Sequence, residues 1–135
     1  MLWLSSLSRT EQRPPDGEWS TWLYVAGRGA GKTRTAAEWL TDMCTRSTVR
    51  AAVIAPTFAD ARDVCIEGDS GVLSVVKRYR VLESWNRSQG SLKMTNGSRI
   101  QIFSGEEPER LRGPQHHYAW IDELAAIGKA REAWD

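Results

Sequence analysis

A glycine-rich stretch near the start of the chain contains the residue types that bind phosphate. In order it reads Ala26, Gly27, Arg28, Gly29, Ala30, Gly31, Lys32 and Thr33. Glycines let successive backbone N–H groups turn toward one anion, and a helix that follows directs its N-terminus at the same place. In such a loop the lysine reaches the β- and γ-phosphates and the hydroxyl ligates Mg²⁺. The stretch therefore predicts a site for ATP and Mg²⁺.

Two residues of this loop, Ala26 and Arg28, are not specified by the usual phosphate-loop pattern. Ala26 replaces the first glycine of the strict Gly-x-x-x-x-Gly-Lys-Ser/Thr pattern, a modest departure because residues 27–32 build most of the cradle. A dinucleotide-binding loop would need a third glycine where Lys32 stands, and an acid after the next strand, which instead ends in Ala55 and Pro56. Arg28 either neutralises transition-state charge as an arginine finger in cis or faces solvent, and physical reasoning leaves both open.

Two carboxylates follow the apolar run at residues 118–121 directly, Asp122 and then Glu123. The carboxyl end of a parallel strand faces the ligand crevice of an open sheet, so we expect both side chains beside the phosphate loop. Asp122 is a hard oxygen ligand suited to magnesium. Glu123 is placed to orient and deprotonate an attacking water, which favours hydrolysis over phosphoryl transfer to a small molecule.

The elements that position these residues follow from apolar patterning. Strands are expected at residues 21–26, 50–55 and 118–121, and helices at 32–46 and 57–67, the second opening on a capping box that runs from Thr57 to Asp60. Residues 72–79 fit either a short helix or a strand. The predicted fold is α/β, a P-loop NTPase with a mostly parallel sheet flanked by helices and truncated after the acidic strand.

A β-hairpin is predicted over residues 91–104. Asn96 and Gly97 supply the two positive-φ residues of a type I′ turn, and the residues on either side alternate between apolar and polar. We expect this hairpin as an insertion at the edge of the sheet.

Composition restricts the class of protein. A hydrophobic fraction of 41% and a charged fraction of 26% are ordinary for a globular domain. No apolar run approaches the roughly 20 residues of a membrane span, and Cys44 and Cys65 form neither a disulfide framework nor a zinc motif, so a cytoplasmic protein is expected. The net charge of +1 gives no overall case for nucleic-acid binding, but residues 77–99 are locally basic, either a solvated surface or a phosphate contact.

Taken together, these motifs resemble the ATPase domain of phage terminase large subunits, the motors that package DNA into procapsids. The resemblance rests on the loop with its internal Arg28, on residues 53–62 and 104–115, and on residues 120–125, and it covers about residues 11–135. The step from Arg112 to Gly113, shortly before the acidic pair, is its most family-specific feature.

The resemblance implies roles for individual residues. Residues 27–33 would bind the ATP phosphates with Arg28 as the loop arginine, Thr33 and Asp122 would hold magnesium, and Glu123 would be catalytic. Arg110 or Arg112 would act across a subunit interface or in coupling, with Arg87 and Arg99 as competitors for that role. Residues 55–57 would couple nucleotide state to DNA, and Trp19 and Trp22 would either contact adenine or pack. The implied partners are double-stranded DNA, a portal protein, a small terminase subunit and further copies in a ring.

Length is the main departure from that family. We expect residues 1–20 to be a leader and 21–135 a partial ATPase domain without the nuclease domain, hence a fragment, a remnant or part of a split gene. On this basis Val53, Ile54, Trp120 and Ile121 should be only partly protected from solvent. The alternative functions are a helicase-like ATPase, a small-molecule kinase, or a remnant that at most binds nucleotide.

Overall fold

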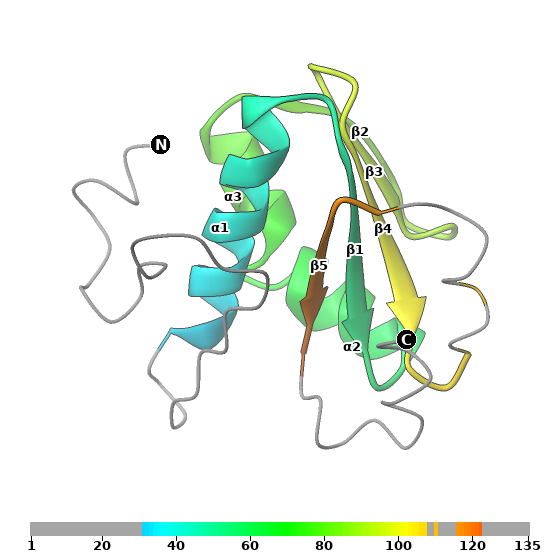
Figure 1. Ribbon diagram of the computed structural model, residues 1–135. Helices are drawn as coiled ribbons and strands as arrows, with labels where there is room; N and C mark the ends of the chain where they lie inside the picture. The colour runs from blue at the N-terminus through cyan, green and yellow to red at the C-terminus, as the bar shows by residue number, and fades with distance from the viewer. Residues whose placement is uncertain (1–30, 108–109, 111–115, 123–135) are drawn as a thin grey trace, which may run out of the picture.

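The computed structural model describes residues 31–107, 110 and 116–122. Its helices lie against one side of a five-stranded sheet (Figure 1). In chain order the elements are α1 (Lys32–Arg46), β1 (Arg50–Ala55), α2 (Phe58–Asp60), the π-helix η3 (Ala61–Ile66), α3 (Val72–Arg78), β2 (Leu82–Asn86), β3 (Ser91–Met94), β4 (Arg99–Ser104) and β5 (Tyr118–Ile121). The predicted leader at 1–20 and strand at 21–26 lie outside the described residues.

The strand order in the sheet is β2-β3-β4-β1-β5. β1 pairs in parallel with both β4 and β5, and β3 pairs antiparallel with β2 and with β4. Among the described strands, only β3 runs against the others. This arrangement confirms the predicted α/β class with a mostly parallel, helix-flanked sheet.

The hairpin at residues 91–104 is present as β3 and β4, but the expectation that it is an edge insertion is wrong. β4 lies next to β1 in the interior of the sheet. The reason is that β4 is apolar on both faces: Ile100 and Ile102 belong to the main core, and Phe103 packs in a second cluster on the other face. A strand buried on both faces belongs in the middle of a sheet.

The predicted type I′ turn is also wrong. Gly97 has φ 91°, but Asn96 is not among the described residues with positive φ. The loop therefore contains one left-handed residue, whereas a type I′ turn requires two. It is closed by hydrogen bonds from the Gly97 N–H to the Met94 carbonyl at 3.0 Å and from the Met94 N–H to the Ser98 carbonyl at 2.8 Å. The Asn96 amide Nδ2 instead donates to the Cys44 carbonyl at the end of α1, at 2.8 Å, a tertiary contact that competes with the local turn preference.

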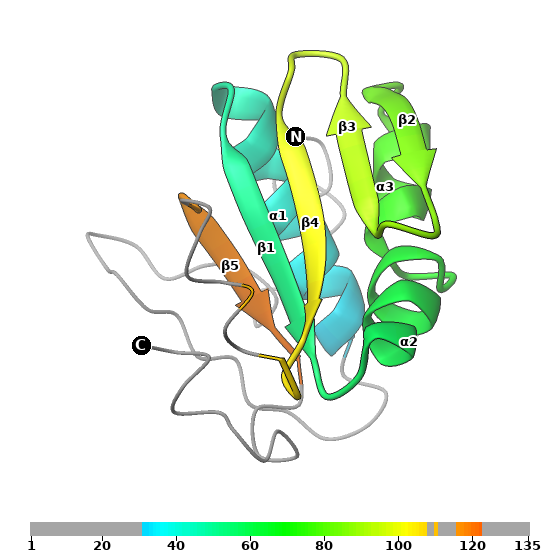
Figure 2. The same cartoon turned by 90° about the vertical axis from the view of Figure 1, so that its right-hand side faces the viewer.

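The core lies between the sheet and the helices. Alternation along β1 places Ala51, Val53 and Ala55 in this main core and Ala52 and Ile54 on the opposite face, which no described helix covers (Figure 2).

Three of the four residues expected to be partly protected are in fact buried. Val53 is 0%, Ile54 2% and Trp120 8% exposed, and only Ile121 is half-buried. Val53 and Trp120 lie in the core beneath the helices, whereas Ile54 packs with Phe103 and Ile121 on the other face.

The helix expected at 57–67 is divided. The Thr57 hydroxyl accepts a hydrogen bond from the Asp60 N–H at 3.1 Å, as the capping box predicts, but α2 gives way after three residues to the π-helix η3. Residues 72–78 form the helical alternative. Cys44 and Cys65 are both buried and are not joined in a disulfide, and burial raises the pKa of Cys44 to about 12. Within the described residues, no helix has the length and apolar character needed to traverse a bilayer.

Candidate nucleotide site at the carboxyl edge of the sheet

The first turn of α1 carries the described end of the predicted phosphate loop. Gly31 precedes the helix with φ 77° and ψ 31°, a left-handed conformation that glycine adopts without a steric penalty. Its carbonyl accepts hydrogen bonds from the Thr35 N–H at 2.9 Å and the Thr35 hydroxyl at 2.8 Å. Lys32 is exposed and Thr33 is half-buried. The loop therefore enters the helix through a fixed left-handed residue, with the lysine open to a ligand.

The N-terminus of α1 has the electrostatic character of an anion site. Among the described residues, no side chain caps it and no acidic residue lies in its first turn. The first N–H groups of a helix have no partner within the helix and its N-terminus carries partial positive charge. A phosphate group bound there would satisfy both features, so this end of α1 fits the predicted ligand.

Asp122 lies directly after β5. β5 pairs in parallel with β1, and the Asp122 N–H extends that pairing by donating to the Ile54 carbonyl at 2.8 Å. The aspartate is half-buried. The pairing places Asp122 at the carboxyl end of the sheet, as the apolar run before it predicts.

Asp122 and the start of α1 lie at the same edge of the sheet. α1 runs opposite to β1 and β5, so its first turn lies at the end where these strands finish (Figures 1 and 2). α1 packs against β5, and the rings of Trp39 and Tyr118 meet edge to face with centroids 5.9 Å apart. The fold thus brings Lys32, Thr33 and Asp122 to one edge from distant parts of the sequence.

Several predicted site residues lie outside the described residues. They are Gly27, Arg28, Gly29 and Ala30 of the loop, the acid Glu123, Arg112, and the tryptophans Trp19 and Trp22. Their roles remain predictions.

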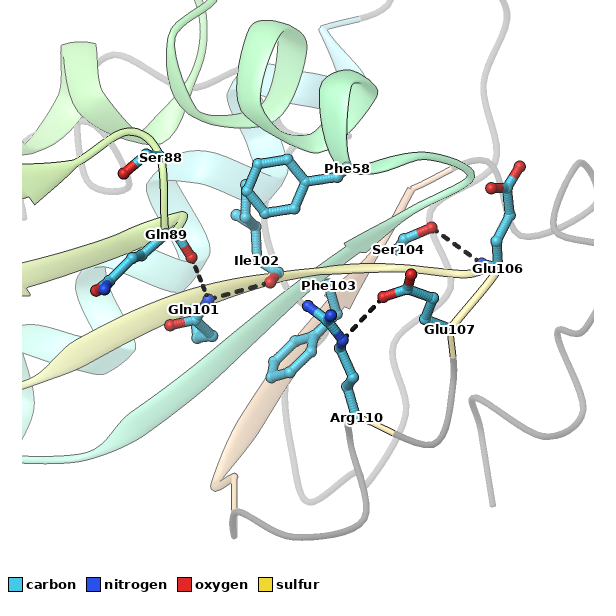
Figure 3. Close-up of a pocket in the computed structure, with 10 residues that line it drawn as sticks. All are labelled: Phe58, Ser88, Gln89, Gln101, Ile102, Phe103, Ser104, Glu106, Glu107 and Arg110. Atoms are coloured by element: carbon cyan, nitrogen blue, oxygen red, sulfur yellow. Dashed lines mark hydrogen bonds and ion pairs between the residues drawn. The ribbon is translucent and has the colours of Figure 1, made fainter.

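A separate cavity of about 380 Å³ opens at the carboxyl end of β4 (Figure 3). Phe58, Gln101, Ser104 and Arg110 are among its lining residues, whereas Lys32, Thr33 and Asp122 are not. The Arg110 Nε lies 2.8 Å from Glu107 Oε2, with both side chains largely exposed. Such surface pairs are weak, so this contact leaves Arg110 able to exchange partners.

Much of the basic cluster at residues 77–99 forms ion pairs within the domain. Arg87 Nε lies 2.9 Å from Glu67 Oε2, Lys93 Nζ 3.1 Å from Glu83 Oε2, and Arg78 3.3 Å from Glu38 Oε1. Each of these three cations therefore has an acidic partner within the described part of the chain. Arg99 is exposed and does not share in this pairing.

Glu38 is not among the predicted site residues, yet its side chain is wholly buried. Its Oε1 lies 2.8 Å from Arg34 Nε on the same helix and 3.3 Å from Arg78 on α3. The four-residue spacing from Arg34 to Glu38 indicates the first pair, but an acid in a mostly polar helix gave no sign of full burial.

The comparisons with known proteins agree with this fold. Residues 23–135 match the family described as "Terminase large subunit, T4likevirus-type, N-terminal", and no curated protein matches. Among solved structures, the large terminase ATPase domain of Thermus phage P74-26 superposes with a TM-score of 0.58 at 23% identity, covering 75% of this chain and 47% of that one. An arginine-to-alanine variant of that domain gives a TM-score of 0.57 at 22% identity, with the same coverage.

This chain thus spans about half the length of those solved domains, and at this level of identity the likeness concerns the fold. The family match covers most of the sequence and includes both the phosphate loop and the acidic pair. The chain belongs to the terminase large-subunit family, and its match is to the N-terminal part of that family.

Proposed function

We propose that this chain is the ATP-binding and ATP-hydrolysing part of a terminase large subunit, which powers translocation of double-stranded viral DNA into a procapsid. The observation that carries the proposal is the shared edge: an exposed Lys32 and half-buried Thr33 lie at a helix N-terminus that no described side chain caps, with Asp122 at the end of a strand that packs against the same helix. That is the arrangement on which ATP hydrolysis by P-loop enzymes depends.

Each residue has a distinct role in this proposal. Residues 27–33 hold the ATP phosphates through backbone N–H groups and the Lys32 ammonium, and Arg28 offsets the negative charge that develops on the transferred phosphoryl group. Thr33 and Asp122 would hold Mg²⁺, which supplies charge neutralisation at the phosphates when bound. Glu123 orients the attacking water and accepts its proton.

The wider role follows from family membership and remains part of the proposal. A packaging motor acts on double-stranded DNA in the host cytoplasm, docked on a portal protein and working with a small terminase subunit. In a ring of copies, Arg110 or Arg112 would reach the ATP of a neighbouring subunit, where an arginine stabilises transition-state charge.

Two substitutions test the nucleotide site. Lys32→Ala should weaken ATP binding by about 2 kcal/mol or more, because a charge-assisted phosphate contact is lost. Glu123→Gln, in the full-length protein, should retain Mg-ATP binding and lose turnover, because the amide keeps the shape but cannot accept a proton.

The measurements are titration calorimetry with Mg-ATP and steady-state phosphate release. Lys77→Ala is the matched control, since it removes an exposed lysine from α3 rather than from the loop. Unchanged ATP affinity in the Lys32 variant would remove the phosphate-loop assignment. Parental turnover in the Glu123 variant would show that another group is the base.

A further inference from the structure

Four residues lie side by side at one edge of the sheet. They stand at the start of β1 and of β4, just before β5, and near the end of β3, which runs in the opposite direction. Lys93 on β3 is opposite Arg99 on β4, and Arg99 is opposite Arg50 on β1. His117 lies beside Arg50, because its N–H donates to the Arg50 carbonyl at 2.8 Å and its Nδ1 accepts from the Arg50 N–H at 3.1 Å. We call Lys93, Arg99, Arg50 and His117 the amino-edge row.

The amino-edge row belongs to the face of the sheet that no described helix covers. Ala51 and Ile100 are in the core beneath the helices, and successive side chains of a strand point to opposite faces. Arg50 and Arg99 therefore project from the face that is turned toward the viewer in Figure 2. Arg50, Arg99 and His117 are exposed, and Lys93 is half-exposed.

The two central cations of the row, Arg50 and Arg99, have no acidic partner among the residues that the structure describes. Lys93 pairs with Glu83, but within the described residues no ion pair engages Arg50 or Arg99. Like charges directly opposite each other on neighbouring strands destabilise a sheet. An anion bound across Arg50 and Arg99 would relieve that repulsion, so the row has the charge of a ligand site rather than that of a balanced surface.

We propose that the amino-edge row, centred on Arg50 and Arg99, contacts the phosphate backbone of double-stranded DNA. This inference rests on the proposed function, which identifies double-stranded DNA as the polyanion that the chain acts on. Guanidinium groups donate paired hydrogen bonds to phosphate, and duplex DNA presents closely spaced phosphates along a rod. Strands about 4.8 Å apart give the row a length of about 14 Å, comparable with the ~12 Å width of the major groove.

The position of the row also suits a motor. It lies at the amino ends of β1 and β4, whereas the candidate nucleotide site lies at the carboxyl ends of β1 and β5. DNA on the row and ATP at the opposite edge would not compete for space. β1 joins the two edges directly, because it carries Arg50 at one end and pairs with the strand before Asp122 at the other.

The test uses the full 135-residue chain and a short DNA duplex of arbitrary sequence. Fluorescence anisotropy at several salt concentrations gives the affinity and its salt dependence. Arg50→Gln with Arg99→Gln should weaken binding by about tenfold or more at low salt and reduce the slope of log K against log salt by about 1.8, since each lost phosphate contact contributes about 0.9. Arg50→Lys with Arg99→Lys should retain the parental slope.

The matched control is Lys77→Ala with Arg80→Ala, which removes the same charge from two exposed residues, one in the last turn of α3 and one just after the helix. It should keep the parental affinity within about twofold. An equal loss in the control and the glutamine variant, or no loss in the glutamine variant, would overturn the proposal. So would a glutamine variant that retains DNA binding and loses binding to an acidic protein of the packaging complex.

Mg-ATP binding measured on the same proteins separates this inference from the proposed function. If the chain binds ATP but its affinity for DNA does not depend on Arg50 and Arg99, the role of the row is overturned and the proposed nucleotide site is not. DNA binding through the row with no ATP binding would leave the row supported and overturn the nucleotide site. Thermal unfolding of the glutamine variant should begin no lower than for the parent, because a like-charge pair is removed.

Discussion

Glu38 shows how a single buried charge connects two helices. Its carboxylate is 0% exposed, while the Arg34 and Arg78 side chains that reach it are 26% and 42% exposed. Burial raises the pKa of Glu38 above its ordinary value near 4.5, against the opposing effect of the hydrogen bond from Arg34 and the charges of both arginines. The desolvation of the carboxylate therefore outweighs its two ion pairs, as is common for buried pairs.

This direction predicts how stability depends on pH. A raised folded-state pKa means that the folded chain binds the Glu38 proton more tightly than the unfolded chain does. The stability that this tighter proton binding contributes is fully present below about pH 4.5. It is lost as the pH rises through the folded-state pKa, and the loss is about 1.4 kcal/mol for each unit by which that pKa is raised. Glu38→Gln cannot titrate, so its stability relative to the parent should increase from pH 4 to pH 7.

Urea unfolding of both proteins across that pH range measures the difference. Other groups, such as Asp63, whose pKa Arg62 lowers, and His116, whose pKa burial lowers, titrate in both proteins and cancel. Parallel stability curves for the two proteins would show that burial does not control the protonation of Glu38.

At the scale of elements, the turn between β3 and β4 closes the C-terminal end of α1. The Ser98 hydroxyl is buried, donates to the Cys44 carbonyl at 2.7 Å and accepts from the Val49 N–H at 3.1 Å. The Asn96 amide donates to the same Cys44 carbonyl. The last carbonyls of a helix have no partner within it, so this turn supplies the cap and fixes the helix against the sheet.

Ser98→Ala should therefore destabilise the chain by about 1–3 kcal/mol, because it leaves the buried Val49 N–H without an acceptor. Thr95→Ala is the control, since Thr95 is exposed in the same turn, and it should change stability by no more than about 0.5 kcal/mol. Chemical denaturation monitored by circular dichroism gives both values. Equal effects for the two variants would show that the cap does not contribute measurably.

The elements that could be predicted are those with strong local patterns. α1, β1 and β5 each carry a run or periodicity that depends only on nearby residues, and they were placed almost to the residue. β2 was not predicted, because in Leu82–Asn86 only Leu82 and Trp85 are apolar, and a register shift between Leu82 and Ser84 disrupts their alternation. The predicted type I′ turn does not form, because the Asn96 side chain is held by a hydrogen bond to Cys44, 52 residues away in the sequence.

At the scale of the whole molecule, the same distinction between local patterns and long-range contacts applies to the candidate nucleotide site and to the amino-edge row. That Lys32, Thr33 and Asp122 lie at one edge was predictable, because the loop pattern is local and the ends of parallel strands share an edge by topology. The amino-edge row was not, because it depends on the register that places Arg50 opposite Arg99, 49 positions away in the sequence. No spacing rule links residues across a sheet until the strand order is known.

The core gives the last prediction. One cluster of buried side chains draws on α1, η3, α3 and four strands of the sheet, with Leu40 of α1 among its largest wholly buried members. A cluster shared among so many elements favours one cooperative transition over separate ones. Unfolding in denaturant followed by far-ultraviolet circular dichroism and by tryptophan fluorescence should therefore give coincident midpoints.

Leu40→Ala should lower the free energy of unfolding by about 2–5 kcal/mol, because the cavity adds to the lost burial. It should lower both midpoints together, because the candidate nucleotide site and the amino-edge row rest on the same core. Val64→Ala is the control, since Val64 is 47% exposed, and its effect should stay within about 0.5 kcal/mol. Two separated transitions in the parent would mean that the two edges of the sheet do not share one folding unit.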